Sequence, residues 1–470
     1  MAGVAARRNG RVEVHPIDPR RLEPIVGAER VAQLVAGAAD LRALLGARRI
    51  VNVNSTATGG GVAEMLTTLL GYVRGVGLEA DWLVVSGDAE FFQITKRVHN
   101  GLYGASGDGG PLGAREREHY ERTTRDNLER LRPAIRAGDV VVVHDPQPAG
   151  LIAPLVELGA LVVWRCHVGH DDGNEWTERA WRFVRPYVDG AHAHVFSRES
   201  FAPAWIDRAF LRTIPPSIDP FAPKNEELGP AEVLAILRGA GFLGPDGVPP
   251  DRRMRHPAEV VQDGPPIDPA APLVVQVSRW DRMKDMPGVL EGFVRHVREP
   301  DAYLALVGPA ASGVSDDPEA GEVWLETRAA WEALAPSDRA RVRLVTVPMD
   351  DPLENALVIN ALQRHATVVV QKSLAEGFGL TVAEALWKTK PVVASAVGGI
   401  VDQVIDGETG LLVRDPHDLE AFGAAVERLL REPAEGERLA RNGRRHVEQS
   451  FLGDRHLLDY AALLTELLER

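Results

Sequence analysis

Two glutamates, Glu376 and Glu384, flank a glycine-containing turn in the stretch "KSLAEGFGLTVAEALWKTKPVVAS", residues 372–395. A short apolar run precedes the first glutamate, and a helical pattern begins only around Leu380. On one continuous helix the two carboxylates would lie about 80° and about 12 Å apart. Because a turn comes before the helix, both carboxylates can instead face one extended ligand at two points.

The stretch suits a diphosphate flanked by two hydroxyl-rich sugars. The helix N-terminus between the glutamates offers free backbone N–H groups, which favour a phosphate. Each carboxylate can accept hydrogen bonds from a sugar diol, and Gly377 and Gly379 let the backbone turn tightly toward such a ligand. The alternative interpretation is a helix N-terminus that simply has a favourable acidic residue nearby.

Two cations follow another strand, in "QVSRWDRMKD", where Arg279 comes just after the strand and Lys284 five residues later. Arginine can bind a phosphate through two parallel hydrogen bonds, and lysine adds a point charge. Together they would stabilise the negative charge that develops on a departing nucleoside diphosphate. The alternative is a pair of solvated cations in a loop.

Polar residues also follow strands in the first half of the chain. Glycines 59–61 separate a strand from a helix in "NSTATGGGVAEML", which is consistent with backbone amides contacting a phosphate or sugar. Their spacing matches neither a dinucleotide fingerprint nor a P-loop. His167 ends the strand of "VWRCHVG", where it can bind a sugar hydroxyl or serve as a structural residue.

One further segment offers polar groups suited to a second sugar, and another mixes aromatic and polar residues. "VVHDPQPAG" places Asp145 and Gln147 at another strand end. "AEFFQITKRVHN" contains Lys96 and Asn100, and we assign its aromatic residues, Phe91 and Phe92, to the core.

The elements that must position these residues are short, valine-rich strands alternating with helical patterns from about residue 49 to 445. Such strands predict parallel sheets covered by helices on both faces. Prolines 215, 216, 220 and 223 interrupt the alternation, which restarts at "PLVVQVSRWDRMKD". We therefore predict an α/β chain of two Rossmann-like, doubly wound domains facing a cleft, with ligands at the carboxyl ends of the strands.

The composition of the chain limits the kinds of partner and the cell compartment that we expect. The chain has 470 residues, of which 45% are hydrophobic, and a formal charge of −14, which argues against a general nucleic-acid binder. The single cysteine, Cys166, permits no intrachain disulfide, so we expect a cytoplasmic protein. No apolar run approaches the roughly 20 residues that span a bilayer, so we expect no membrane partner.

Taken together, these segments resemble the retaining glycosyltransferases of family 4, which have the GT-B fold. The matching residues are Arg279 and Lys284 of "SRWDRMK" and the two glutamates of "EGFGLTVAE". The strings "NSTATGGGVAE", "AEFFQITKRVHN", "VHDPQPA", "WRCH", "PPSIDP" and "AVGGIVDQVIDGETGLLV" resemble the trehalose-forming branch of that family. The likeness covers about residues 45 to 465.

The resemblance implies domains and roles. It implies an acceptor-side domain of residues 1–216, joined by the C-terminal helix 450–470, and a donor-side domain of residues 217–449. The roles it implies are diphosphate binding by Arg279 and Lys284, hydroxyl contacts by Glu376, a ribose contact by Glu384, donor contacts by Gly60, Gly61, Gly377, Phe378, Gly379 and Leu380, a place beside the transferred glucose for His167, and acceptor binding by Asp145, Gln147, Lys96 and Asn100.

The implied reaction transfers glucose from ADP-, UDP- or GDP-glucose to free glucose, giving α,α-trehalose with retention, and its reversal is an option. We find no convincing carboxylate nucleophile, which favours front-face attack assisted by positioning and by stabilisation of the leaving diphosphate. We expect no metal site and no tightly bound cofactor, with Mg²⁺ as an optional companion of the diphosphate. A homodimer is one option for the assembly.

Two features of this sequence differ from what the trehalose-forming branch leads us to expect. Asp285 follows Lys284 where the resemblance leads us to expect glycine, and residues 243–271 form an insertion that we expect to be irregular. The alternatives are a family 4 transferase with another acceptor, such as sucrose, a glucan or a glycolipid precursor, and a nucleotide-sugar-binding protein without turnover. A dehydrogenase is disfavoured because no dinucleotide fingerprint follows the first strand.

Overall fold

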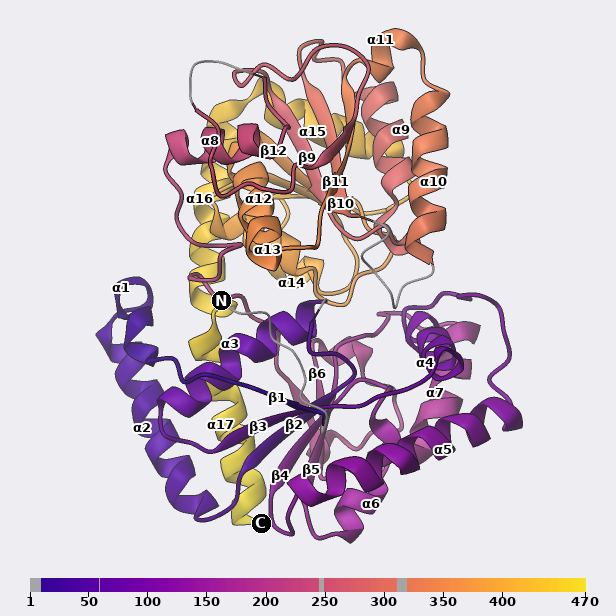
Figure 1. The fold of residues 1–470 in the computed structure, drawn as a ribbon, viewed down its shortest axis with the longest axis vertical. Coiled ribbons are helices and arrows are strands. Elements are labelled where there is room, and N and C mark those ends of the chain that lie inside the picture. Colours follow the sequence, from indigo (N-terminus) through magenta and orange to yellow (C-terminus); the bar gives the residue numbers. More distant parts are fainter. Residues whose placement is uncertain (1–9, 59, 245–248, 311–318) are drawn as a thin grey trace. The chain divides into compact units, whose positions relative to one another are not determined.

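The computed structural model describes residues 10–58, 60–244, 249–310 and 319–470. Contacts between residues divide the chain into two units (Figure 1). The first unit comprises the residues up to Ile218, the three residues Glu376–Phe378 and the C-terminal segment from Gln449. The second unit comprises Asp219–Ala375 and Gly379–Glu448, so the division follows Ile218, two residues beyond the predicted boundary.

The first unit is a doubly wound α/β sheet whose strand order is β1-β3-β2-β4-β5-β6-β7. Its strands are β1 (Arg11–Val12), β2 (Ile50–Asn54), β3 (Ala80–Val84), β4 (Val140–His144), β5 (Leu161–Cys166), β6 (Ala193–Phe196) and β7 (Leu211–Thr213). Its helices are α1 (Glu23–Val26), α2 (Ala28–Leu45), α3 (Gly61–Gly75), α4 (Ala89–Leu102), α5 (Ala114–Leu131), α6 (Ile152–Glu157), α7 (Glu175–Val188) and α17 (Gly453–Glu469).

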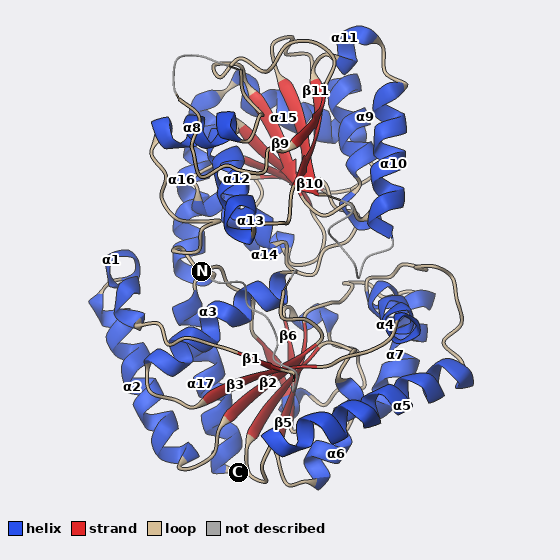
Figure 2. Cartoon of the chain, in the orientation of Figure 1, coloured by secondary structure: helices blue, strands red, loops and turns tan. Residues whose placement is uncertain are grey.

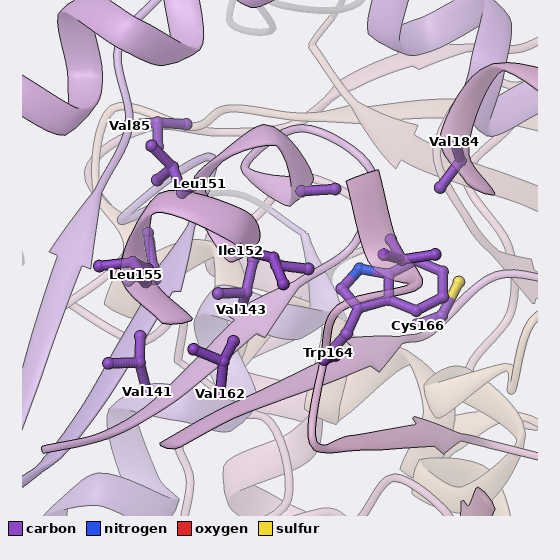
Figure 3. Packing of buried hydrophobic residues seen from close by; sticks show 14 of the residues in the cluster. Val85, Val141, Val143, Leu151, Ile152, Leu155, Val162, Trp164, Cys166 and Val184 are labelled. Carbon is purple, nitrogen blue, oxygen red and sulfur yellow. The ribbon is translucent and has the colours of Figure 1, made fainter. Parts of the chain in front are cut away.

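Alternate residues of the central strands supply the two faces of this sheet, because side chains in a strand alternate in direction. Val141 and Val143 of β4, with Val162 and Trp164 of β5, pack against α6 and α7 (Figure 3). Val142 and Val163 face the opposite side, where α2 and α17 cover them. The valine-rich runs are buried on both faces for this reason.

The second unit has a sheet of order β14-β13-β12-β9-β10-β11-β8 (Figure 2). Its strands are β8 (Glu259–Val261), β9 (Leu273–Val277), β10 (Tyr303–Pro309), β11 (Val342–Val347), β12 (Val368–Gln371), β13 (Val392–Ser395) and β14 (Leu411–Val413). Its helices are α8 (Pro230–Gly239), α9 (Met286–His296), α10 (Glu319–Glu332), α11 (Pro336–Arg339), α12 (Pro352–His365), α13 (Leu380–Trp387), α14 (Ile400–Gln403), α15 (Leu419–Arg431) and α16 (Pro433–Ser450).

Both sheets are parallel except at one edge, and the predicted α/β fold is confirmed with this refinement. β1 pairs antiparallel with β3, and β8 pairs antiparallel with β11. β8 lies within the insertion that we expected to be irregular, so that expectation was wrong for Glu259–Val261. β8 is only three residues long, which is too short to leave a periodic pattern in the sequence.

No helix in the described part of the chain combines the length and the apolar character that crossing a membrane requires.

A small cavity lies within the first unit, where helices α2, α3 and α17 pack on strands β2 and β4. Its volume is about 80 Å³, and apolar side chains line most of it, among them Ala38, Leu41, Leu66 and Leu464. A void of this kind lowers stability because the atoms around it lose packing partners.

We expect Ala38→Leu to fill the cavity and to raise the free energy of unfolding by about 1–2 kcal/mol. Thermal unfolding measured by calorimetry checks this. The matched control is Ala36→Leu on the same helix, because Ala36 is exposed whereas Ala38 is buried. The control should change stability by less than about 0.5 kcal/mol; a loss of stability in Ala38→Leu alone would show that no void is present.

Candidate active site

The loops that follow β9 and β12 carry the predicted diphosphate ligands and the first glutamate. β9 and β12 are neighbouring parallel strands, so their carboxyl ends share one edge of the sheet. Arg279 is exposed on the loop after β9 and donates to the Asp281 carboxylate at 3.1 Å. Lys284 closes a short 3-10 turn, Arg282–Lys284, that precedes α9.

The buried side chain of Gln276 connects these two loops. Its amide nitrogen donates to the carbonyl of Lys284 at 2.7 Å, and its amide oxygen accepts from the backbone N–H of Lys372 at 3.0 Å. A backbone bond from Leu374 to the carbonyl of Met283, at 2.8 Å, adds a second connection. These bonds therefore fix the turn that holds Lys284 beside Lys372, which lies four residues before Glu376.

Asp285 has a structural explanation. Its φ is 46°, in the left-handed region that favours glycine, which is also the residue that the resemblance leads us to expect there. Aspartate tolerates this region better than most residues. Its carboxylate caps α9 by accepting from the N–H of Gly288 at 3.2 Å and forms an ion pair with Lys372, which is 1% exposed. The extra acid therefore neutralises a buried cation.

Helix α13 begins at Leu380, as the helical pattern predicts. Gly379 precedes it with a φ of 87°, and no side chain caps the helix. The first N–H groups of α13 therefore receive no side-chain cap, as a phosphate site requires. Glu384, in the second turn, is 2% exposed, and its carboxylate lies 3.9 Å from the ammonium of Lys224.

The residues between β12 and α13 are buried, apart from the half-buried Leu374. Glu376 is 8% exposed and lies with Gly377 and Phe378 in the three residues grouped with the first unit. The Phe378 ring packs edge-on against Phe451, with 5.4 Å between ring centroids. Packing within the protein thus accounts for the aromatic side chain at position 378.

In the first unit, Asp145 and His167 form a close pair. They follow the neighbouring parallel strands β4 and β5. One carboxylate oxygen of Asp145 accepts from the backbone N–H of His167 at 2.7 Å, and the other lies 3.0 Å from the ring atom Nδ1. The His144 ring stacks on the His167 ring, with centroids 5.4 Å apart and planes 8° from parallel.

Burial sets the ionisation of this group. It lowers the pKa of His167 against the attraction of Asp145, and it lowers the pKa of His144 well below its usual value. Burial by itself would raise the pKa of Asp145, but His167 outweighs it and holds that pKa below its usual value. The hydrogen bonds from His167 favour the charged form of Asp145, and burial favours the uncharged form of His167.

The remaining predicted residues occupy separate loops and helices. Gly60 caps the start of α3 with a φ of 88°, and Gly61 is the first residue of that helix; Gly59 lies outside the described residues. Lys96 and Asn100 lie one turn apart on α4. Gln147 follows β4, and its buried Oε1 accepts no hydrogen bond from the described residues.

Several residues of the site were missed at the sequence level. Gln276, Lys372 and His144 all lie within or directly after valine-rich strands, and a polar residue in such a strand is a signal that burial will require a partner. Asn52 is a fourth, since its side-chain oxygen lies 2.8 Å from Nε2 of His144. Across the described residues, no three His, Cys, Asp or Glu side chains gather in a way that could hold a metal ion.

Solved structures identify the fold. A trehalose-6-phosphate synthase matches with a TM-score of 0.67 at 13% identity, over 89% of this chain and 98% of that one. The sucrose-phosphate synthase of Thermosynechococcus elongatus matches with a TM-score of 0.64 at 19% identity, over 90% and 100% of the two chains. The architecture is that of the GT-B glycosyltransferases.

Sequence comparison narrows the class. Residues 52–203 match the family described as trehalose synthase, N-terminal domain, and residues 345–446 match glycosyl transferases group 1. The trehalose synthases of Pyrococcus horikoshii and Rubrobacter xylanophilus are each 34% identical to this chain, over 95% and 91% of it and 97% and 93% of their own lengths. The chain belongs to the trehalose synthase family of glycosyltransferases.

We expect Lys372→Met and Asp285→Asn to be strongly coupled. Either change alone leaves one member of a largely buried ion pair without its partner, which should lower the free energy of unfolding by about 3 kcal/mol. The double variant should lose less than about 1 kcal/mol, because asparagine still caps the helix and tolerates a positive φ. Urea denaturation of all four proteins measures the coupling.

The control is the exposed pair Glu291 and Arg295 on α9, whose side chains are 50% and 64% exposed. Its coupling should stay below about 0.5 kcal/mol. If the effects of Lys372→Met and Asp285→Asn simply add, the ion pair does not explain Asp285.

Proposed function

We propose that this protein transfers glucose from a nucleoside diphosphate glucose to free glucose, forming α,α-trehalose with retention of the donor's α-configuration. The observation that carries the proposal is the connection through Gln276, which holds the turn of Lys284 beside the chain leading to Glu376. A donor needs cations for its diphosphate and a hydroxyl-binding carboxylate for its sugar, and these two loops supply both. Membership of the trehalose synthase family supports trehalose as the product.

In the proposed reaction the bond between glucose C1 and the phosphate oxygen breaks, and a bond from C1 to an acceptor hydroxyl oxygen forms on the same face. The acceptor's proton passes to the departing phosphate oxygen. Arg279 and Lys284 would bind that diphosphate and stabilise its growing charge. Backbone N–H groups at the start of α13, between Gly379 and Leu380, would add to this stabilisation.

The other proposed roles follow the sequence assignments. Glu376 would bind hydroxyls of the transferred glucose, Glu384 would bind the ribose, and His167 would lie beside the sugar. Gly60, Gly61, Gly377 and Phe378 would also contact the donor. For the acceptor we retain Gln147, Lys96 and Asn100. We propose no resident metal, and any Mg²⁺ would arrive with the diphosphate.

Incubation of the protein with ADP-, UDP- and GDP-glucose, each with free glucose, tests the reaction. We expect α,α-trehalose, identified by chromatography and by its proton NMR spectrum, with rates that rank the three donors. Parallel incubations contain EDTA or added Mg²⁺, and others offer maltose alone, trehalose with phosphate, or alternative acceptors. Conversion of maltose, or phosphorolysis of trehalose, without transfer from any donor would overturn the proposal.

We expect Arg279→Ala and Lys284→Ala each to lower kcat/KM by about 10²–10³-fold, since each removes a charge that stabilises the leaving group. The matched control is Arg282→Ala in the same turn. Its guanidinium is engaged by acids of α10, at 2.7 Å from Glu326 and 3.1 Å from Glu322. This control should change the rate less than about 3-fold; near-normal turnover in both test variants would refute diphosphate binding by these cations.

A further inference from the structure

Asp145 directs both of its carboxylate oxygens at one residue. Oδ1 accepts from the backbone N–H of His167 at 2.7 Å, and Oδ2 lies 3.0 Å from the ring atom Nδ1. The two residues are 22 positions apart in the sequence and meet because β4 and β5 are parallel neighbours. Both side chains are largely buried, at 14% and 10% exposure.

This geometry determines where the imidazole carries its proton. An ionised carboxylate can only accept hydrogen bonds, so Nδ1 must be the donor. Burial lowers the pKa of His167 and so favours the neutral ring, which carries one proton. Nε2 is therefore an unprotonated acceptor. It is buried, and no group of the described residues hydrogen-bonds to it.

The surroundings hold Asp145 in place for this purpose. Its φ of 65° is in the left-handed region, which is uncommon for a residue other than glycine even though aspartate tolerates it better than most. Its backbone N–H donates to the carbonyl of Arg165 at 2.7 Å, and its carbonyl accepts from the indole of Trp164 at 3.1 Å. The stacked His144, bonded to Asn52, covers one face of the His167 ring. A strained residue held by this many contacts points to a functional role.

We propose that Asp145 is a positioning residue that fixes His167 in the tautomer whose Nε2 accepts a hydrogen bond from a sugar hydroxyl. The identity of the sugar as a substrate rests on the proposed function. The inference gives Asp145 an indirect role in place of the direct acceptor contact expected from the sequence. It also defines the ligand group, because an unprotonated nitrogen binds a hydroxyl donor and repels an acceptor-only group such as a phosphate oxygen.

The first test reads the tautomer by ¹⁵N NMR of histidine-labelled protein, with the His167 signals assigned by their loss in His167→Gln. We expect a protonated Nδ1 and an unprotonated Nε2 in the unmodified protein. In Asp145→Asn the amide can accept from the backbone N–H of His167 but then presents its NH₂ to Nδ1. We expect the proton to move to Nε2 in this variant. A proton on Nε2 of the unmodified protein overturns the inference, whatever the activity.

A second NMR measurement addresses the hydroxyl. Saturation with glucose or with the preferred nucleoside diphosphate glucose should shift the Nε2 signal while Nδ1 stays protonated. This readout needs binding but no turnover, so it separates the inference from the proposed reaction. An Nε2 signal that no sugar shifts contradicts the hydroxyl contact.

Kinetics separate positioning from direct binding. Asp145→Asn should lower kcat/KM by at least about 10²-fold, the scale of one misdirected catalytic hydrogen bond. In a protein that already carries His167→Ala, the same change should have less than about a 3-fold effect, because Asp145 acts through the imidazole. An equal loss in both backgrounds would show that Asp145 contacts the substrate itself. Asp189→Asn, at an exposed position at the end of α7, is the control for a simple loss of charge.

Discussion

Parallel pairing of neighbouring strands is the constraint from which the functional loops of each unit follow. When two parallel strands pair, their carboxyl ends lie at one edge of the sheet, and the residues that follow them become neighbours. The pairing of β4 with β5 brings Asp145 to His167. The pairing of β9 with β12 brings Lys284 to Lys372, with Gln276 connecting the two loops. The same geometry thus builds two clusters of polar residues with different compositions.

The polar groups at these edges are buried, and each needs a partner that the sheet alone does not provide. Lys372 is fully buried and receives the carboxylate of Asp285. His144 is buried and receives the side chain of Asn52. In both units a residue with a positive φ supplies a carboxylate to a buried cation or ring. Asp285 supplies it to Lys372, and Asp145 supplies it to His167. Local backbone strain is therefore compensated by the satisfaction of a buried group, which fixes the positions of the loops.

Helices α3 and α13, one in each unit, begin in the same way. Gly60 precedes α3 with a φ of 88°, and Gly379 precedes α13 with a φ of 87°. Neither helix receives a side-chain cap, so its first N–H groups are available to an oxygen-rich ligand. A side chain at either glycine would be strained in this backbone conformation, which explains why both turns contain glycine.

The sequence by itself determined the central strands of both sheets and their alternation with helices. Runs of valine marked the central strands, because a strand buried on both faces has no polar side to show. The glycines before Leu380 marked the start of α13. It also placed Arg279 and His167 just after strands and Glu376 in the loop before α13, which local patterns suffice to show.

Only the tertiary structure decided which of these residues meet. The partners Asp285 and Lys372 are 87 positions apart, and Asp145 and His167 are 22 apart, so no local pattern links them. The edge strands β1 and β8 have two and three residues, too few for a periodic signal, and form because a neighbouring strand offers hydrogen bonds. Pairing across the sheet and burial of charge depend on the whole fold, and for that reason only the fold decides which polar residues become neighbours.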